Sequence, residues 1–426
     1  DGLLNKCLVA AVDPIENADQ HNMHGRILSH ERAHGSMWLH CALTHGRDVM
    51  ASRLVLHIGT QKSGTTYLQR VLAHLSAELS DAGVLYPTRI GGRGPVYNHE
   101  AAAYGLLGTE SFPWVSPARA TAQESVWSRL VEQVQQWPGP VVVSGEALSV
   151  VNADAARRLV EALAVTPTDI IITARDLGRV IPSSWQQHIR NGRSTTFSAY
   201  LRQLSQRRGA SAGESTNAEW ELDPDQTFWR AYAIGSLVNR WSPLARSVTV
   251  VPVPRGGADP HELWQRFATS LELGHVLPHI PPHIDSIGAN VGITEPEALV
   301  LAGLNRQSRN SSLTDPALRQ LRGRIVKDAF VPRADRGNPV RLPPAWLDQV
   351  RAWADADVND LMRTDAKIVG PVEDLRVDAS LRAGVSTPPQ QVASAAGAAL
   401  YLLNQPPPAE APAAPTRKKR RGPRSG

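Results

Sequence analysis

Short apolar runs alternate along the chain with segments of helical periodicity. Continuous apolar runs of five to eight residues, closed by Gly, Pro or a polar residue, are typical of strands buried on both faces of a parallel sheet. We therefore expect five such strands, at residues 53–59, 83–87, 140–146, 169–175 and 247–254.

The segments between these runs carry the apolar spacing of amphipathic helices. The clearest begins at Thr65, where leucine and valine recur at positions 68, 71, 72, 75 and 79. Helices are also expected at 153–164 and 260–273, and the Gly/Ser/Asp-rich segment 209–226 is expected to be a linker or mobile loop. Alternation of strand and helix predicts an α/β fold with three layers, α/β/α, around a central parallel sheet.

The two ends of the chain differ in composition from the middle. Residues 1–49 hold both cysteines, Cys7 and Cys41, and show no periodic apolar pattern. We expect them to form a disordered leader ahead of a natural start at Met50. The folded domain is expected at 50–385, and the Pro/Ala-rich, then basic, segment 386–426 is expected to be a disordered tail.

The charge of the chain is concentrated in that tail. The net charge is +5, but six basic residues and no acidic ones lie in 411–426, and without them 39 basic residues face 40 acidic ones. This distribution predicts no specific nucleic-acid partner. No apolar run reaches the roughly 20 residues that a membrane span needs, so none is predicted. A folded domain without cysteine suits the reducing cytoplasm, and the sequence leaves the oligomeric state open.

The segment 59–66, GTQKSGTT, lies between the first strand and the first helix. Its two glycines, Gly59 and Gly64, stand five residues apart, which allows a tight loop whose N–H groups surround an anion at a helix N-terminus. The glycine spacing matches the Walker A pattern of P-loop enzymes. However, the lysine that should follow the second glycine is missing and stands two residues before it, at Lys62.

A second candidate anion site follows the fourth strand. Arg175 ends that strand, and Ser183 follows eight residues later with Ser184 beside it. A guanidinium at the strand end and a hydroxyl in the next helix can converge on one phosphate at the edge where α/β folds bind ligands. Asp176 is expected to hold Arg175.

Together these segments resemble the sulfotransferases that use 3′-phosphoadenosine 5′-phosphosulfate (PAPS), especially a bacterial branch. QKSGTTYLQ is similar to their 5′-phosphosulfate loop, P-K-[ST]-G-T-[ST], with Gln61 where many relatives carry Pro or His, and Arg175 and Ser183 have the spacing of their 3′-phosphate motif. The resemblance implies a P-loop-type fold, PAPS as co-substrate without a metal, and Lys62 stabilising the leaving oxygen. The donor-binding residues that it implies are Gln61, Lys62, Ser63, Gly64, Thr65, Thr66, Arg175, Ser183 and Ser184.

Two residues compete for the role of general base, which must take a proton from the acceptor hydroxyl or amine. His99 lies after the second strand, in the region where related bacterial enzymes carry a histidine, and Glu146 ends the third strand. Either could instead make only structural hydrogen bonds. His99 is slightly preferred because a neutral imidazole accepts a proton at pH 7 without a shifted pKa.

The alternative to a sulfotransferase is a P-loop nucleotide-dependent kinase, and a non-catalytic binding protein is a further one. A kinase needs Mg²⁺ and an acidic residue at a strand end to hold it, and such residues are scarce here. The acceptor cannot be identified from the sequence and could be a small molecule, a carbohydrate or a lipid.

Overall fold

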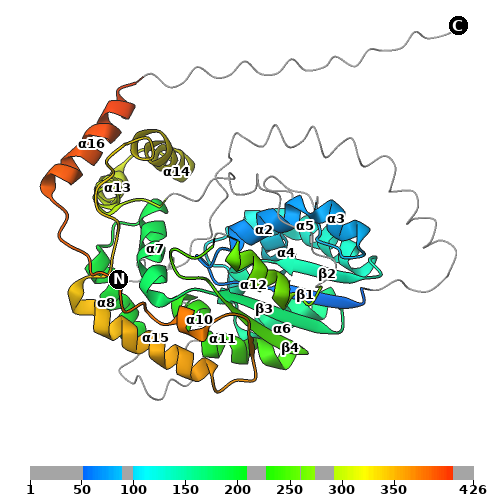
Figure 1. Cartoon of the computed structure of the whole chain (residues 1–426). Helices are drawn as coiled ribbons and strands as arrows, with labels where there is room; N and C mark the ends of the chain where they lie inside the picture. Colours follow the sequence, from blue (N-terminus) through cyan, green and yellow to red (C-terminus); the bar gives the residue numbers. More distant parts are fainter. Residues whose placement is uncertain (1–50, 89–98, 209–226, 260, 274–291, 406–426) are drawn as a thin grey trace, which may run out of the picture.

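The computed structural model describes residues 51–88, 99–208, 227–259, 261–273 and 292–405. They form an α/β fold around a five-stranded, fully parallel sheet, with the strand order β2-β1-β3-β4-β5 (Figure 1). The strands are β1 (Arg53–His57), β2 (Pro140–Ser144), β3 (Thr168–Ala174), β4 (Ser247–Pro252) and β5 (Lys367–Ile368).

Four of the predicted strands are confirmed, and the one expected at 83–87 is wrong. That segment makes an isolated bridge, Leu85 to Val141, at the outer edge of β2. The fifth strand of the sheet is instead the two-residue β5, which is too short to give an apolar run in the sequence.

Helices cover both faces of the sheet because successive side chains of each strand point to opposite sides. Val55 of β1 packs with α2 (Thr65–His74), α3 (Ser76–Asp81) and α12 (Glu262–Ser270). Leu54 and Leu56 face the other core, which they share with α4 (His99–Ser111), α5 (Pro117–Gln135), α6 (Ala153–Leu163) and α11 (Ile234–Trp241). In Figure 1, α2 and α3 lie on one side of the sheet, and α6 and α11 lie on the other.

The remaining helices extend the second core and carry the chain beyond the sheet. They are α7 (Leu177–Arg190), α8 (Phe197–Arg208), α10 (Thr227–Tyr232), α13 (Glu295–Gln307), α14 (Asp315–Arg324), α15 (Leu347–Leu361) and α16 (Pro389–Leu403). A turn of 3₁₀-helix, η2 (Glu146–Val150), directly follows β2, and a π-helical segment, η6 (Ile325–Phe330), continues α14.

The C-terminal segment corrects the expectation of a disordered tail from residue 386. Residues 389–403 form α16, which packs against α13 and η6 and buries Ala395 and Ala399. Alanine and leucine are strong helix formers, so this Ala-rich stretch folds once a neighbouring surface receives it. The expected leader at 1–49, the loop at 209–226 and the basic residues 406–426 lie outside the described residues. Within the described part, no helix is long and apolar enough to cross a membrane.

Candidate functional site

The loop between β1 and α2 has the backbone of an anion-binding turn. Lys62 and Gly64 both have positive φ, 66° and 83°, which turns the chain sharply before α2 begins at Thr65. Among the described residues, no side chain caps the N-terminus of α2, and its first turn carries no acidic residue. The first N–H groups of a helix carry partial positive charge and need acceptors, so this end can take an anion.

A buried polar network supports the loop from below. The His57 ring bonds to Ser144 Oγ through Nδ1 at 2.9 Å and to Thr173 Oγ1 through Nε2 at 3.0 Å. Thr173 Oγ1 in turn lies 2.8 Å from Ser63 Oγ, and Ser63 also donates to the Thr60 carbonyl. Burial lowers the pKa of His57 to about 3, so its ring is neutral. The Ser63 hydroxyl therefore points into the protein, and the N–H groups of Ser63 and Thr60 also donate within it, to the carbonyls of Thr60 and Thr173.

Gly59 is required where the loop leaves β1. A Cβ at this position would lie 2.1 Å from Thr173 Oγ1 and 2.6 Å from His57 Nε2, both of which belong to the buried network. Neither group can retreat without breaking its hydrogen bonds. The first glycine of the motif thus permits the loop and the network to pack together.

Lys62 connects the loop to α7. Its Nζ donates to Gln187 Oε1 at 3.0 Å, and its backbone carbonyl accepts from Arg175 Nη1 at 3.4 Å. Burial lowers the pKa of Lys62, the nearby Glu146 carboxylate opposes this shift, and Arg190 and Arg175 add to it. Several cations thus gather at one point, as expected where a multiply charged anion binds.

Arg175 lies directly after β3, as predicted, but its acidic neighbour does not hold it. Asp176 caps α7 by accepting from Arg179 N at 3.0 Å, and it pairs with the Arg179 guanidinium. The expectation that Asp176 holds Arg175 is therefore wrong, because a helix N-cap turns this carboxylate toward the first turn of its own helix. Arg175 Nε is buried and has no hydrogen-bond partner among the described residues. Burial and Arg179 lower the pKa of Arg175, and the charges of Asp176 and Tyr232 oppose this shift.

Ser183, Ser184 and Gln187 share one side of α7, because residues three and four apart are neighbours on a helix. Ser184 hydrogen-bonds to Tyr232, and the Tyr232 hydroxyl donates to the Gln61 carbonyl at 3.1 Å. Gln61 is thus held through its backbone. These contacts connect the loop to α7 and α10. Ser183, the residue before Ser184, is partly buried.

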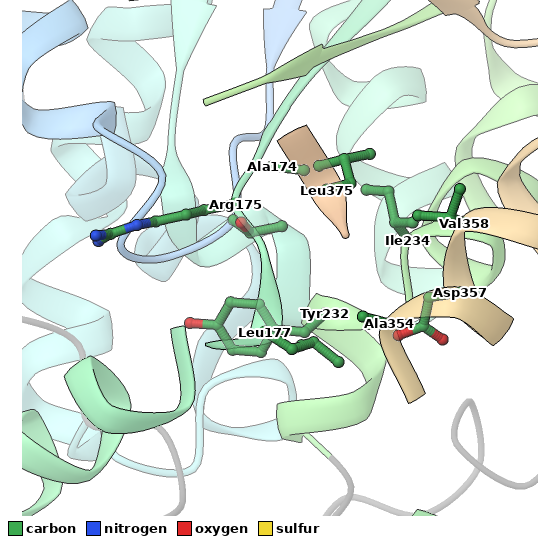
Figure 2. Close-up of a pocket in the computed structure, with 10 residues that line it drawn as sticks. Ala174, Arg175, Leu177, Tyr232, Ile234, Ala354, Asp357, Val358 and Leu375 are labelled. Carbon is green, nitrogen blue, oxygen red and sulfur yellow. The ribbon is translucent and has the colours of Figure 1, made fainter. Parts of the chain in front are cut away.

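A small pocket lies beside Arg175 and is shown in Figure 2. The Arg175 guanidinium and the Tyr232 hydroxyl both extend away from the pocket, toward the loop that follows β1, while Asp357 of α15 closes the opposite end. Asp357 is paired with Arg208, and burial raises its pKa to about 6. The rest of the wall is mainly apolar and is formed by Ala174, Leu177, Ile234, Ala354, Val358 and Leu375.

Glu146 lies at the N-terminus of α2, beside Lys62. It begins η2 directly after β2, and its Oε2 accepts a hydrogen bond from the Thr65 hydroxyl. The structure therefore brings Lys62, Thr65 and Glu146 together, from a loop, a helix and a strand end, although 81 residues separate Thr65 from Glu146. A carboxylate in this place can accept a proton from a group that approaches Lys62.

His99 does not have the surroundings of a general base. Its ring is buried, Nε2 lies 2.6 Å from the Pro87 carbonyl, and the Ser144 N–H donates to Nδ1 at 3.0 Å. Nε2 must therefore carry the proton, and both nitrogens are engaged by backbone groups. Burial lowers the pKa of His99 to about 4. The geometry favours a structural role for His99 and leaves Glu146 as the candidate base beside Lys62.

Four residues of the site were missed from the sequence: Glu100, Gln187, Arg190 and Tyr232. Glu100 accepts hydrogen bonds from the Tyr104 hydroxyl and from Ala147 N, and burial and the charge of Glu146 raise its pKa to about 7. Gln187 and Arg190 could have been found by extending the spacing of Ser183 along α7. Tyr232 had no local signal, since it ends the short helix α10 far along the chain.

Comparison with known proteins gives no match. No model of a known protein family matches the chain, and no curated protein matches it with statistical significance.

Among the described residues, no group of three or more His, Cys, Asp and Glu side chains could hold a metal ion. The function must therefore be inferred from the geometry of the site itself.

Proposed function

We propose that this protein is a sulfotransferase, which moves a sulfuryl group from PAPS to a hydroxyl or amine of an acceptor. One observation carries this proposal: Arg175 Nη1 lies 3.4 Å from the carbonyl of Lys62, across 113 residues of sequence. The two cations stand after β1 and β3, which are neighbours in the parallel sheet. Ligands of α/β folds bind at this edge of the sheet, and a donor with two separate anionic groups needs two such cations.

The donor can be placed on these residues by its charges. Its 5′-phosphosulfate would lie on the N–H groups of the loop and of the first turn of α2, with Lys62, Thr65 and Thr66 around it. Its 3′-phosphate would lie on Arg175, whose buried Nε lacks a partner within the described part of the chain, and on Ser183. A donor held in this way would fit a P-loop-type fold adapted to a nucleotide with a 3′-phosphate.

Transfer would follow from the positions of Glu146 and Lys62. The acceptor oxygen or nitrogen attacks sulfur while its proton passes to the Glu146 carboxylate. The bond between sulfur and the bridging oxygen breaks, and the electron pair stays on that oxygen as 3′-phosphoadenosine 5′-phosphate (PAP) leaves. The Lys62 ammonium lies where this negative charge develops and stabilises it. The products are the sulfated acceptor and PAP, and Glu146 returns its proton to water.

The experiment that tests this function follows the transferred atoms. The full chain would be incubated with ³⁵S-labelled PAPS and a mixed panel of phenols, sugars and amines, and in parallel with γ-³²P-labelled ATP and Mg²⁺. We expect ³⁵S in an acceptor and no ³²P. Label transferred from ATP instead would contradict the proposal and indicate a kinase.

A further inference from the structure

Arg190 places a third cation at the site, and the donor accounted for above does not use it. It is half-buried at the C-terminal end of α7, close enough to Lys62 to lower the pKa of that lysine. Burial lowers the pKa of Arg190 itself, and no carboxylate of the described residues pairs with it. A partly desolvated cation without a counter-charge is costly in a folded protein unless a ligand supplies the charge.

Further arginines surround the chain that follows Arg190. Arg322 of α14 donates from Nε to the Arg190 carbonyl at 3.1 Å, and its guanidinium lies against Gly192, 3.1 Å from where a Cβ would be. Arg309 donates from Nη2 to Ser194 Oγ at 2.7 Å. The acidic residue that acts on Arg322 is Asp315, at the start of α14. This end of α7 is therefore positive, and it attracts anions.

The order of residues along α7 indicates whether Arg190 lies on the donor side or the acceptor side of the proposed site. Ser183, Gln187 and Arg190 are spaced i, i+4 and i+7, so they lie along one side of the helix. With a rise of 1.5 Å per residue, Gln187 lies about 6 Å beyond Ser183, and Arg190 about 4.5 Å beyond Gln187. Ser183 belongs to the 3′-phosphate end and Gln187 contacts Lys62 at the sulfuryl end. Arg190 therefore lies past the sulfuryl group, on the acceptor side.

We propose that Arg190, supported by Arg322, binds an anionic group of the acceptor. The acceptor class would then be hydroxyl compounds that carry a carboxylate, sulfate or phosphate near the hydroxyl to be modified. A planar guanidinium binds such a group with two parallel hydrogen bonds, which fixes its orientation as well as its charge. This inference rests on the proposed sulfotransferase function, because it takes the acceptor side from the position of the donor.

The test compares acceptors that differ only in charge, with the full chain saturated with PAP. One pair is 4-nitrophenyl β-D-glucuronide with 4-nitrophenyl β-D-glucoside, and the other is 4-hydroxyphenylacetate with 4-hydroxyphenylacetamide. Ligand-observed NMR gives the affinity of each compound for the unaltered protein, Arg190→Gln and Arg190→Lys. Arg306→Gln is the control, since Arg306 is an exposed arginine of α13 and its loss changes the net charge equally.

We expect the anionic member of at least one pair to bind ten times more tightly than its neutral partner. That ratio should fall to about one in Arg190→Gln, recover in part in Arg190→Lys and stay unchanged in Arg306→Gln, with PAP affinity within twofold throughout. Equal binding of both members, binding of neither, or a ratio insensitive to Arg190→Gln would overturn the inference. Loss of PAP binding in Arg190→Gln would also overturn it, by assigning Arg190 to the donor. Failure of the unaltered protein to bind PAP would instead remove the proposed function.

Discussion

The Lys62 ammonium donates a hydrogen bond to Gln187 Oε1 at 3.0 Å and so ties the loop after β1 to the last turn of α7. This bond holds the lysine in one place, because burial has removed much of the water that would otherwise solvate it. The same helix begins next to Arg175 and carries Ser183. One rigid element thus sets the distance between the two cations that we propose bind the donor, which is a requirement for selecting a donor by the separation of its charges.

Replacement of Arg175 should remove the ability to distinguish nucleotides by their 3′-phosphate. In Arg175→Ala, the affinity for PAP should fall about 100-fold, a loss of about 2.7 kcal/mol, which is the range for a hydrogen bond to a charged group. Affinity for AMP, which lacks the 3′-phosphate, should change little. Isothermal titration of both nucleotides measures this difference. An equal loss for both would show that Arg175 acts on the loop and not on the 3′-phosphate.

Replacement of Glu146 should separate chemistry from binding. Glu146→Gln keeps the size of the side chain and its contact with Thr65, but it cannot accept a proton as a carboxylate does. We expect kcat for sulfuryl transfer to fall by roughly 10²- to 10⁴-fold, the usual contribution of a general base, with PAP affinity nearly unchanged. Glu161→Gln, an exposed position of α6, is the matched control. Full activity in Glu146→Gln would exclude Glu146 as the base.

The loop packs so closely against its buried network that one methyl group added at Gly59 should lower the stability of the protein. Gly59→Ala should destabilise the protein by about 1–3 kcal/mol, because its Cβ overlaps Thr173 Oγ1 and His57 Nε2. Gly303→Ala is the control, since a Cβ there meets no atom within 4 Å and the residue lies inside α13. It should stabilise the protein by up to about 1 kcal/mol. Urea denaturation measures both; similar effects at the two positions would contradict the packing.

His99 should make stability depend on pH. Its pKa in the folded protein is lowered from an ordinary 6.5 to about 4, so the unfolded chain takes up a proton first as the pH falls. The stabilisation that the neutral His99 ring adds to the free energy of unfolding is complete above pH 6.5 and is lost as the pH falls toward 4. The difference in unfolding free energy between the unaltered protein and His99→Gln should therefore shrink by about 1.4 kcal/mol per pH unit across this window. A difference that does not vary with pH would show that the ring is not held neutral.

Much of the framework of the site could be predicted because it depends on local sequence. Arg175 directly follows a buried strand, and Lys62 lies in the loop that follows another. The ends of parallel strands meet at one edge of the sheet whatever the rest of the chain does. Glu146 was identifiable for the same reason. The loop's conformation was indicated by Gly64, which tolerates the positive φ that the turn requires.

The residues that could not be predicted are those whose role depends on packing between distant segments. The ring of His99 is turned inward by the Pro87 carbonyl and Ser144 N–H, which no pattern around His99 reveals. Asp176 looked like a partner for Arg175 by adjacency, but the start of α7 directs it to Arg179. The composition of residues 389–403 predicts a disordered tail where α16 forms, because composition says nothing of the surface on α13 that receives this helix.

The central claim, that the cations of Lys62 and Arg175 together bind a 3′-phosphorylated donor, is tested most directly by titrating PAP into the full chain without Mg²⁺. ATP with Mg²⁺ is titrated alongside, and Lys62→Ala is compared with Lys327→Ala, an exposed lysine of η6. The account predicts micromolar binding of PAP that is lost in Lys62→Ala, kept in Lys327→Ala and stronger than that of ATP. Preference for ATP with Mg²⁺, or PAP binding that survives Lys62→Ala, would contradict it.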